Sequence, residues 1–304
     1  FLPYYNNGSE KLYIERSGAS KQESFKFAFD VGMPLINFHS PRTSISQAYG
    51  LAQLMSHPLI EKTFQDTLAK DGRPILLVST KETMKTDEQR ILDQSQLILE
   101  NQYIRLSRLP IEAFDHKKDE AIEQFDRIRG NLIPQNQLLL SDSTDFLIYR
   151  PFDAEKAGIT FSGAGAYHSK GKNGTRLLMH QFDLDTITTF EISAWIYADP
   201  NVSAFPALFF KVYDQQSKAL IKTYVYNPKD FVDLYENWSR VSIVAELPPR
   251  QYFTVELLHE NLRLPQANNI LDELLIRPIH IDVYRENQNT NQLIKNNYVL
   301  RDSQ

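Results

Sequence analysis

The pattern of apolar and polar residues changes character along the chain, and its strongest feature is one long apolar run. Residues 190–197, Phe-Glu-Ile-Ser-Ala-Trp-Ile-Tyr, carry only two clearly polar side chains, Glu191 and Ser193. Runs this rich in β-branched and aromatic residues, bounded by turn residues such as Asp199-Pro200, predict a strand that is packed on both faces. We therefore expect this strand to lie inside a β-sandwich.

In the first part of the chain, short apolar runs alternate with segments of helical periodicity. The aromatic and aliphatic residues of segment 24–31 alternate strictly with other residues, which predicts a half-buried strand. Further strands are predicted at residues 34–38, 74–78 and 103–109, and helices at residues 45–55, 58–70, 86–99 and 119–129. Strands and helices that alternate with short connections are typical of right-handed parallel units. We expect a small, mainly parallel α/β domain over residues 1–133.

Helical periodicity does not return after residue 130. Residues 134–144 are rich in Pro, Asn, Gln and Ser around three leucines, which indicates a linker. Strand-like runs separated by turn residues follow at residues 146–150, 175–182, 188–197, 206–213, 220–226, 238–245, 252–259 and 270–276. Such a succession predicts a β-sandwich or jelly roll over residues 145–285. Residues 286–304, mostly Asn, Gln and charged residues, are predicted to form a polar tail.

Length and composition narrow the class of protein. A chain of 304 residues suits two domains, and its 42% hydrophobic and 23% charged residues are typical of a globular protein. The net charge of −5 gives no basic excess, so we expect no nucleic-acid partner. The absence of cysteine excludes disulfides, thiolate metal sites and a cysteine nucleophile. Because the chain begins at Phe1, we treat it as a fragment, which leaves room for a membrane-embedded segment upstream.

Three pieces of the second half carry a family resemblance. They are residues 150–153 (Arg-Pro-Phe-Asp), residues 169–177 followed by 190–197, and residues 235–242 (Tyr-Glu-Asn-Trp-Ser-Arg-Val-Ser) followed by 270–278. In this order and spacing they resemble the galactose-binding-like jelly rolls that include many carbohydrate-binding modules. The resemblance covers roughly the last half of the chain and implies its fold. It leaves the ligand open, because this fold serves sugars, lipids, proteins and purely architectural roles.

The resemblance also implies a candidate metal site. In some members of that fold, a carboxylate of the first strand and an Asp of the closing strand hold a structural calcium ion together with backbone oxygens. Asp153 and Asp272 fall on these two positions, and calcium requires hard oxygen ligands. Two side chains fall short of the roughly six to eight oxygens that calcium takes, and Lys170 and Lys172 lie in the intervening turn. The alternative, two surface carboxylates, stays open, and no other cofactor is indicated.

Aromatic residues are the candidates for contact with a sugar that the resemblance implies. The two tryptophans, Trp195 and Trp238, lie within strand patterns, so we expect both in the core. The ligand-binding candidates at strand ends and in loops are Tyr167, His168, Tyr224 and Tyr226.

A second candidate site follows the predicted strand at residues 34–38. Ser40, Arg42, Thr43 and Ser44 stand where a helix begins, and free N–H groups at a helix N-terminus bind anions. The alternative is that a serine caps the helix and Arg42 is solvated, because capping alone accounts for such residues.

Standard catalytic signatures are absent from the sequence. There is no GxSxG, GxxxxGK[ST], HExxH or complete GxGxxG motif, and the seven histidines are dispersed. We therefore expect a non-catalytic, extracytoplasmic region, bacterial in origin, that recognises a glycan or a cell-surface protein. The alternative is the accessory part of a glycan-active enzyme, a hydrolase or a membrane glycosyltransferase, with reactive groups in the N-terminal loops. A purely architectural role is the third hypothesis.

Overall fold

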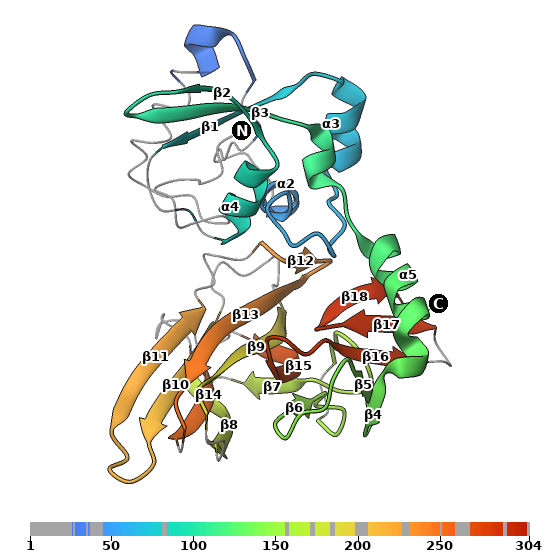
Figure 1. Ribbon diagram of the computed structural model, residues 1–304, viewed down its shortest axis with the longest axis vertical. Helices are drawn as coiled ribbons and strands as arrows, with labels where there is room; N and C mark the ends of the chain where they lie inside the picture. Colours follow the sequence, from blue (N-terminus) through green and yellow to red (C-terminus); the bar gives the residue numbers. More distant parts are fainter. Residues whose placement is uncertain are drawn as a thin grey trace. The chain divides into compact units, whose positions relative to one another are not determined.

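The computed structural model divides into two compact units (Figure 1). The first comprises Phe1–Lys117 with Lys229–Leu234, and the second comprises Lys118–Pro228 with Tyr235–Gln304. The structure describes residues 26, 28–34, 36, 45–80, 84, 86–155, 158–170, 174–182, 186–197, 206–226, 232–249, 251–258, 268–287 and 291–302.

The sheet of the first unit is antiparallel throughout, so the predicted parallel arrangement of the α/β domain is wrong. Its strands are β1 (Ile75–Thr80), β2 (Gln96–Glu100) and β3 (Ile104–Leu109), in the order β1-β3-β2. The wrong topology came from predicting one helix over 86–99. In the structure, helix α4 (Thr86–Asp93) ends earlier, and Ser95 Oγ donates a hydrogen bond to Leu92 O at 2.6 Å in the turn that follows. Strand β2 follows this turn directly, whereas parallel pairing needs a crossover of about a dozen residues.

The helices of the first unit agree only partly with the sequence patterns. They are α2 (Ile45–Gln53), α3 (Gln65–Asp71), α4 and the short 3₁₀ helix η1 (Ile111–Phe114). Helix α3 begins later than predicted but ends as predicted, at Gly72 with a left-handed φ of 68°. The strand predicted at 24–31 is wrong: Lys26 and residues 28–31 are helical, and Phe29 is 86% exposed. The strand predicted at 34–38 falls mostly outside the described residues, and Pro34 is not in a strand.

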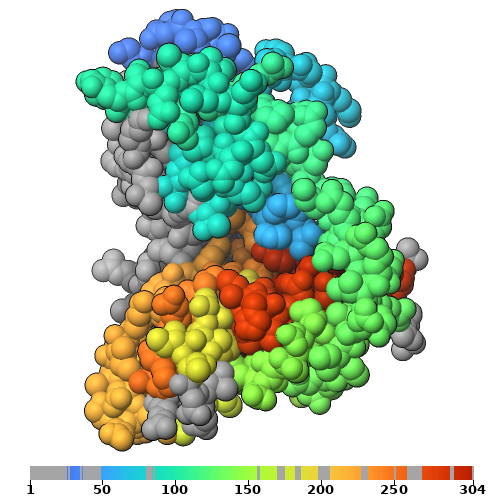
Figure 2. Space-filling view, viewed as in Figure 1, coloured from blue at the N-terminus to red at the C-terminus, as the bar shows by residue number. Residues whose placement is uncertain are grey.

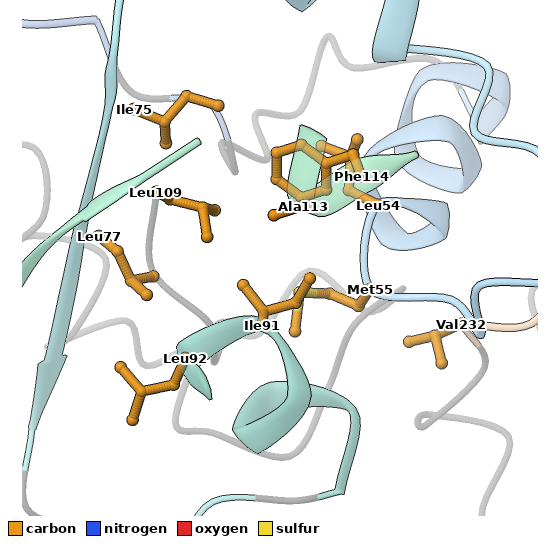
Figure 3. Close-up of a cluster of buried hydrophobic side chains, with 10 residues drawn as sticks. All are labelled: Leu54, Met55, Ile75, Leu77, Ile91, Leu92, Leu109, Ala113, Phe114 and Val232. Atoms are coloured by element: carbon orange, nitrogen blue, oxygen red, sulfur yellow. The ribbon is translucent and has the colours of Figure 1, made fainter. Parts of the chain in front are cut away.

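A hydrophobic core holds these elements together (Figure 3). Leu77 of β1, Leu109 at the end of β3, Ile91 of α4 and Phe114 of η1 are fully buried in it. Val232, far away in the sequence, also belongs to this cluster. Two hydrogen bonds fix the segment around Val232, from Gln53 Nε2 to Leu234 O and from His57 N to Asp233 Oδ1, each of 2.7 Å. The first unit is therefore completed by the segment Lys229–Leu234, which follows strand β11 (Leu220–Tyr226) in the sequence.

The second unit contains two antiparallel sheets that form the predicted β-sandwich. One sheet has the order β11-β10-β14-β8, and the other has the order β12-β13-β9-β15-β6, with β7 paired to β15. Their strands are β6 (Ile148–Arg150), β7 (Tyr167–Lys170), β8 (Gly174–Phe182), β9 (Thr188–Tyr197), β10 (Ala207–Asp214), β11 (Leu220–Tyr226), β12 (Leu234–Tyr235), β13 (Trp238–Leu247), β14 (Gln251–Leu258) and β15 (Asn268–Pro278). Trp195 and Trp238 are 1% and 4% exposed, which confirms their place in the core.

A third sheet contacts β9 through hydrogen bonds of Asn297 with Ser193 and Trp195, and it contains strands from both segments that we predicted as linker and tail. Its order is β18-β17-β16-β5-β4, with strands β4 (Ile133–Gln135), β5 (Leu138–Leu140), β16 (Val283–Asn287), β17 (Gln292–Lys295) and β18 (Tyr298–Arg301). Helix α5 (Lys118–Ile128), which runs into the 3₁₀ turn η2 (Arg129–Asn131), packs on this sheet through Phe125, whose ring centroid lies 5.2 Å from that of Tyr284. Figure 2 shows the C-terminal residues, in red, among the other segments of this unit.

The predictions of a linker at 134–144 and a polar tail at 286–304 are therefore wrong, for a physical reason. Trp195 Nε1 donates a hydrogen bond to Asn297 O at 2.8 Å, and Arg240 Nη2 donates one to Asn296 O at 2.8 Å. The asparagines sit at positive φ in the β17–β18 turn, where their main-chain and side-chain polar groups satisfy buried partners. The polar residues of the β17–β18 turn therefore belong to a buried hydrogen-bond network and are not exposed to solvent. Among the described residues, no helix has the length and apolar character needed to cross a membrane.

Candidate functional site

The second unit has a cleft of about 400 Å³ between the β4–β5 hairpin and strand β6. We call it the amide cleft, and its lining residues are Gln135, Asn136, Gln137, Leu138, Leu147, Ile148 and Tyr149. Its volume falls within the range of about 300–1,000 Å³ that is typical of small-molecule sites. The cleft combines three consecutive amide side chains with an aliphatic and aromatic wall. None of the described residues that line it is charged.

The β4–β5 hairpin determines where the amides stand. Gln135 pairs directly with Leu138 across a two-residue turn, so the two side chains share one face of the hairpin. Leu138 is 5% exposed and is anchored in a core cluster with Leu275 and Val283, whereas Asn136 and Gln137 are exposed at the turn. Asn136 has a φ of 54°, a left-handed conformation that asparagine tolerates better than most residues. The apolar side of the hairpin thus holds its amide-bearing end at the rim of the cleft.

Tyr149 forms the opposite wall of the cleft, and its position is fixed by strand pairing and by a hydrogen bond to Glu273. Strand β6 pairs with β15, which places Tyr149 opposite Leu275, and the Tyr149 hydroxyl donates a hydrogen bond of 2.6 Å to Glu273 Oε2. Burial and the nearby Glu273 carboxylate raise the pKa of Tyr149, so the phenol remains a donor at ordinary pH. The Arg285 guanidinium lies 5.7 Å from the centre of the same ring. Tyr149 is therefore held in one orientation before any ligand arrives.

A buried charged group lies beneath this wall. Glu273 sits at a bulge in β15 with a φ of 56°, accepts a hydrogen bond from Ser162 Oγ and lies 3.0 Å from Arg285 Nη1. Burial raises the pKa of Glu273, while Arg285 opposes that rise. Burial, followed by the charge of Glu273, raises the pKa of the adjacent Asp272 to about 8. Glu273 and Arg285 also line a cavity of about 10 Å³, and Leu138 and Tyr149 line both this cavity and the amide cleft.

The ligand-binding candidates from the sequence lie elsewhere in the second unit. Tyr167 and His168 are half-buried in β7, and the Tyr167 hydroxyl donates a hydrogen bond to Thr175 Oγ1 at 2.8 Å. Tyr224 and Tyr226 are half-buried in β11, and the Tyr224 hydroxyl lies 3.3 Å from Glu246 O. The structure assigns the two pairs to different sheets, so it does not bring the four residues together as one set. Sequence reasoning missed the amide cleft, although three adjacent amide residues were a signal that could have found it.

The two metal candidates contact the same short segment, residues 161–164. Asp272 Oδ2 accepts hydrogen bonds from the backbone N–H groups of Phe161 and Ser162, at 2.9 and 3.2 Å. Asp153 Oδ1 accepts one from Ala164 N at 2.8 Å. Asp272 is fully buried, whereas Asp153 is exposed. Among the described residues, no three His, Cys, Asp or Glu side chains are grouped so that they could hold a metal ion.

Backbone oxygens add to the oxygen-rich surroundings of Asp153. The carbonyl oxygens of Phe152, Asp153 and Glu155 converge on Gly165, where a side-chain carbon would come within 2.2 to 2.9 Å of them. These hard donors are of the kind that calcium takes. The oxygen atoms available to a metal ion are thus one carboxylate oxygen of Asp153 and these backbone carbonyls. Asp272 instead accepts hydrogen bonds from backbone N–H groups. The anion-site candidates Ser40, Arg42, Thr43 and Ser44 lie outside the described residues.

Comparison with known proteins gives only weak likenesses. No family model matches the chain, and no curated protein matches it. Among solved structures, a family 35 carbohydrate binding module from an environmental isolate matches at 14% identity, covering 47% of this chain and 94% of that one, with a TM-score of 0.28. The CBM22-1 xylan-binding domain of Paenibacillus barcinonensis Xyn10C matches at 12% identity, covering 45% and 83%, with a TM-score of 0.28.

Carbohydrate-binding modules are thus among the solved structures that this chain resembles, and they are the class that the sequence motifs resemble. At TM-scores this low, the likeness fixes neither a ligand nor the position of a site.

Proposed function

We propose that the chain is a non-catalytic glycan-binding region and that the amide cleft holds the sugar. The observation that carries the proposal is a cleft in which Gln135, Asn136 and Gln137 face an aliphatic and aromatic wall ending in Tyr149. An amide group both donates and accepts hydrogen bonds, which matches the hydroxyl groups of a sugar. The apolar wall offers a surface for the C–H groups of a sugar ring. The described lining includes no carboxylate, imidazole or thiol, so it supports binding without bond cleavage.

The edge of the third sheet favours a sugar over an extended peptide in this place. Strand β4 is the outermost strand and is only three residues long, with Pro134 at its centre. Proline lacks the N–H group that a new neighbouring strand would require, and short proline-bearing edges resist strand addition. A peptide that extended the sheet would therefore be poorly accommodated. We extend the proposal to an extracytoplasmic location, which is supported by the sequence resemblance.

Replacing Gln135 or Gln137 by alanine tests the proposal. We expect each substitution to weaken the binding of a neutral oligosaccharide by about 2- to 12-fold, the effect of one lost hydrogen bond of roughly 0.5–1.5 kcal/mol. Isothermal titration with ligands chosen on a glycan array measures the change. Gln216→Ala is the matched control, because Gln216 is an exposed glutamine on the β10–β11 turn. Unchanged affinity in both cleft variants, or equal loss in the control, would refute the assignment.

A structural calcium ion at the turn around Asp153 is a separate proposal. Asp153 and the carbonyl oxygens of residues 152, 153 and 155 would hold the ion, and it would tie the first strand of the sandwich to segment 161–164. We expect calcium to raise the Tm of wild-type protein over that in chelator, and to have no such effect on Asp153→Asn. An identical Tm in calcium and in chelator would rule the ion out.

A further inference from the structure

We infer that the amide cleft selects uncharged sugar units and rejects acidic ones such as uronates. This inference deepens the proposed function and rests on it. It starts from the lining: Gln135, Asn136 and Gln137 carry no charge, and Leu138, Leu147 and Ile148 carry no polar side-chain atom. A carboxylate that enters such a surface gives up water without gaining a cation, which is unfavourable.

Arg150, which follows Tyr149 in the sequence, and Arg285, which lies against the Tyr149 ring, both make other contacts. Arg150 follows Tyr149 in β6, but its Nη1 donates a hydrogen bond of 2.6 Å to Leu177 O and its guanidinium lies 5.4 Å from the centre of the Phe152 ring. Arg285 lies 3.0 Å from Glu273 Oε1 and donates a hydrogen bond of 2.7 Å to Ser162 Oγ. Moving either side chain toward the cleft would leave a buried acceptor without its donor.

Tyr149 adds a second reason for the same preference. Its hydroxyl is directed at Glu273, so the phenol proton is not free to donate to a ligand carboxylate. Among the described side chains that line the cleft, the donors left for a ligand are the amide N–H groups of the hairpin. Every amide also brings a carbonyl oxygen that repels an anion. Neutral hydroxyl groups satisfy both halves of the amide, whereas a carboxylate satisfies only one.

The experiment compares matched pairs of sugars on the intact chain. Titrations would use tetragalactose against tetragalacturonate, and xylotetraose against xylotetraose bearing a glucuronate substituent. We expect the acidic member of each pair to bind at least about tenfold more weakly. We also expect the affinity for the neutral member to be the same at low and high salt, because no ion pair contributes to it.

A variant with a positive charge in the cleft should gain affinity for acidic sugars. A folding defect would not produce such a gain. Gln137 is exposed at the hairpin turn, so Gln137→Lys is expected to fold normally. The lysine should bring the acidic sugars to within about threefold of the neutral ones and make their binding salt-dependent. Gln216→Lys, which adds the same charge at an exposed glutamine of the β10–β11 turn outside the cleft, is the control and should leave the preference unchanged.

The outcomes separate the inference from the proposed function. Neutral sugars that bind while acidic ones bind tenfold more weakly support both. Acidic sugars that bind as tightly as neutral ones, with salt dependence, overturn the selectivity and leave glycan binding intact. No binding of any of the four sugars, or of any array glycan, overturns the proposed function and the selectivity with it.

Discussion

Replacing Glu191 by glutamine is expected to lower the free energy of unfolding of the second unit by about 3–5 kcal/mol at pH 7. Glu191 accepts hydrogen bonds from Arg240 Nη2 at 2.6 Å and from Arg277 Nε at 2.9 Å, and the three side chains are 1 to 9% exposed. Glutamine would turn an NH₂ group toward one of the two guanidinium groups and remove the negative charge that compensates both. Two buried guanidinium groups would then lose the carboxylate that they share.

The effect should depend on pH in a defined direction. The two arginines outweigh the opposing effect of burial and lower the pKa of Glu191 from 4.5 to about 2. Because the folded-state pKa is depressed, this carboxylate stabilises the fold fully above about pH 4.5, and the stabilisation is lost as the pH falls from 4.5 toward 2. The difference between wild type and Glu191→Gln should therefore shrink over this window.

Urea denaturation followed by tryptophan fluorescence measures this difference cleanly. Both tryptophans of the chain, Trp195 and Trp238, belong to the second unit, so the signal reports on that unit alone. Glu246→Gln is the matched control: Glu246 is an exposed acid on the same sheet, and its replacement should change stability by no more than about 0.5 kcal/mol. Equal stabilities for Glu191→Gln and the control would contradict the buried ion network.

Ending the chain after Asn287 is expected to abolish cooperative folding of the second unit. The truncation removes β17 and β18, and with them several hydrogen bonds to the sandwich. Arg240 would lose Tyr298, whose hydroxyl lies 2.9 Å from Arg240 Nη1. Glu273 O would lose its donor Asn297 Nδ2, at 2.6 Å, and Trp195 Nε1 would lose its acceptor. Several buried polar groups left unpaired at about 1–3 kcal/mol each exceed the stability of a typical domain when the lost apolar packing is added.

Circular dichroism melting and tryptophan fluorescence would test the truncation. A chain that ends after Asp302 is the control, because it keeps every described residue of β18. We expect the control to melt like the full chain and the shorter chain to lack a cooperative transition. A shorter chain that melts within a few degrees of the full one would mean that residues 288–304 behave as a dispensable tail.

The features that sequence patterns predicted correctly are those that depend on apolar density. Strand β9 has hardly any polar side chains to offer to solvent, and the structure buries residues 190–196 of it. The buried Trp195 and Trp238 follow from the same reasoning. Local turn chemistry was also informative, since the Asp-Gly pair at the end of α3 gives the expected left-handed glycine.

The wrong predictions share one cause: the composition of a segment does not show which residues from distant parts of the chain contact it. The alternation in residues 24–31 looks like a strand, but Phe29 is exposed on a helix. Residues 96–99 continue a helical pattern in sequence, yet they belong to β2, which pairs with β3, and the pairing partner decides their conformation. Asn296 and Asn297 look solvated but are 8% and 3% exposed, because tertiary hydrogen bonds satisfy them.

The candidate site was missed for a related reason. Gln135, Asn136 and Gln137 have the composition of a linker, and only the pairing of β4 with β5 makes them one wall of a cleft. The opposite wall, at Tyr149, comes from a strand of another sheet. The tyrosines and histidine that we chose from the sequence were chosen for their aromatic character, without knowledge of which cleft they would line.

The most direct test of the glycan-binding proposal is a crystal structure of the protein soaked with a neutral oligosaccharide that binds in titration. We predict density for the sugar in the amide cleft, with hydroxyl groups within hydrogen-bonding distance of Gln135 or Gln137 and a ring against Tyr149. Density at Tyr167 and His168, at Tyr224 and Tyr226, or anywhere else with the cleft empty, would contradict the assignment of the site.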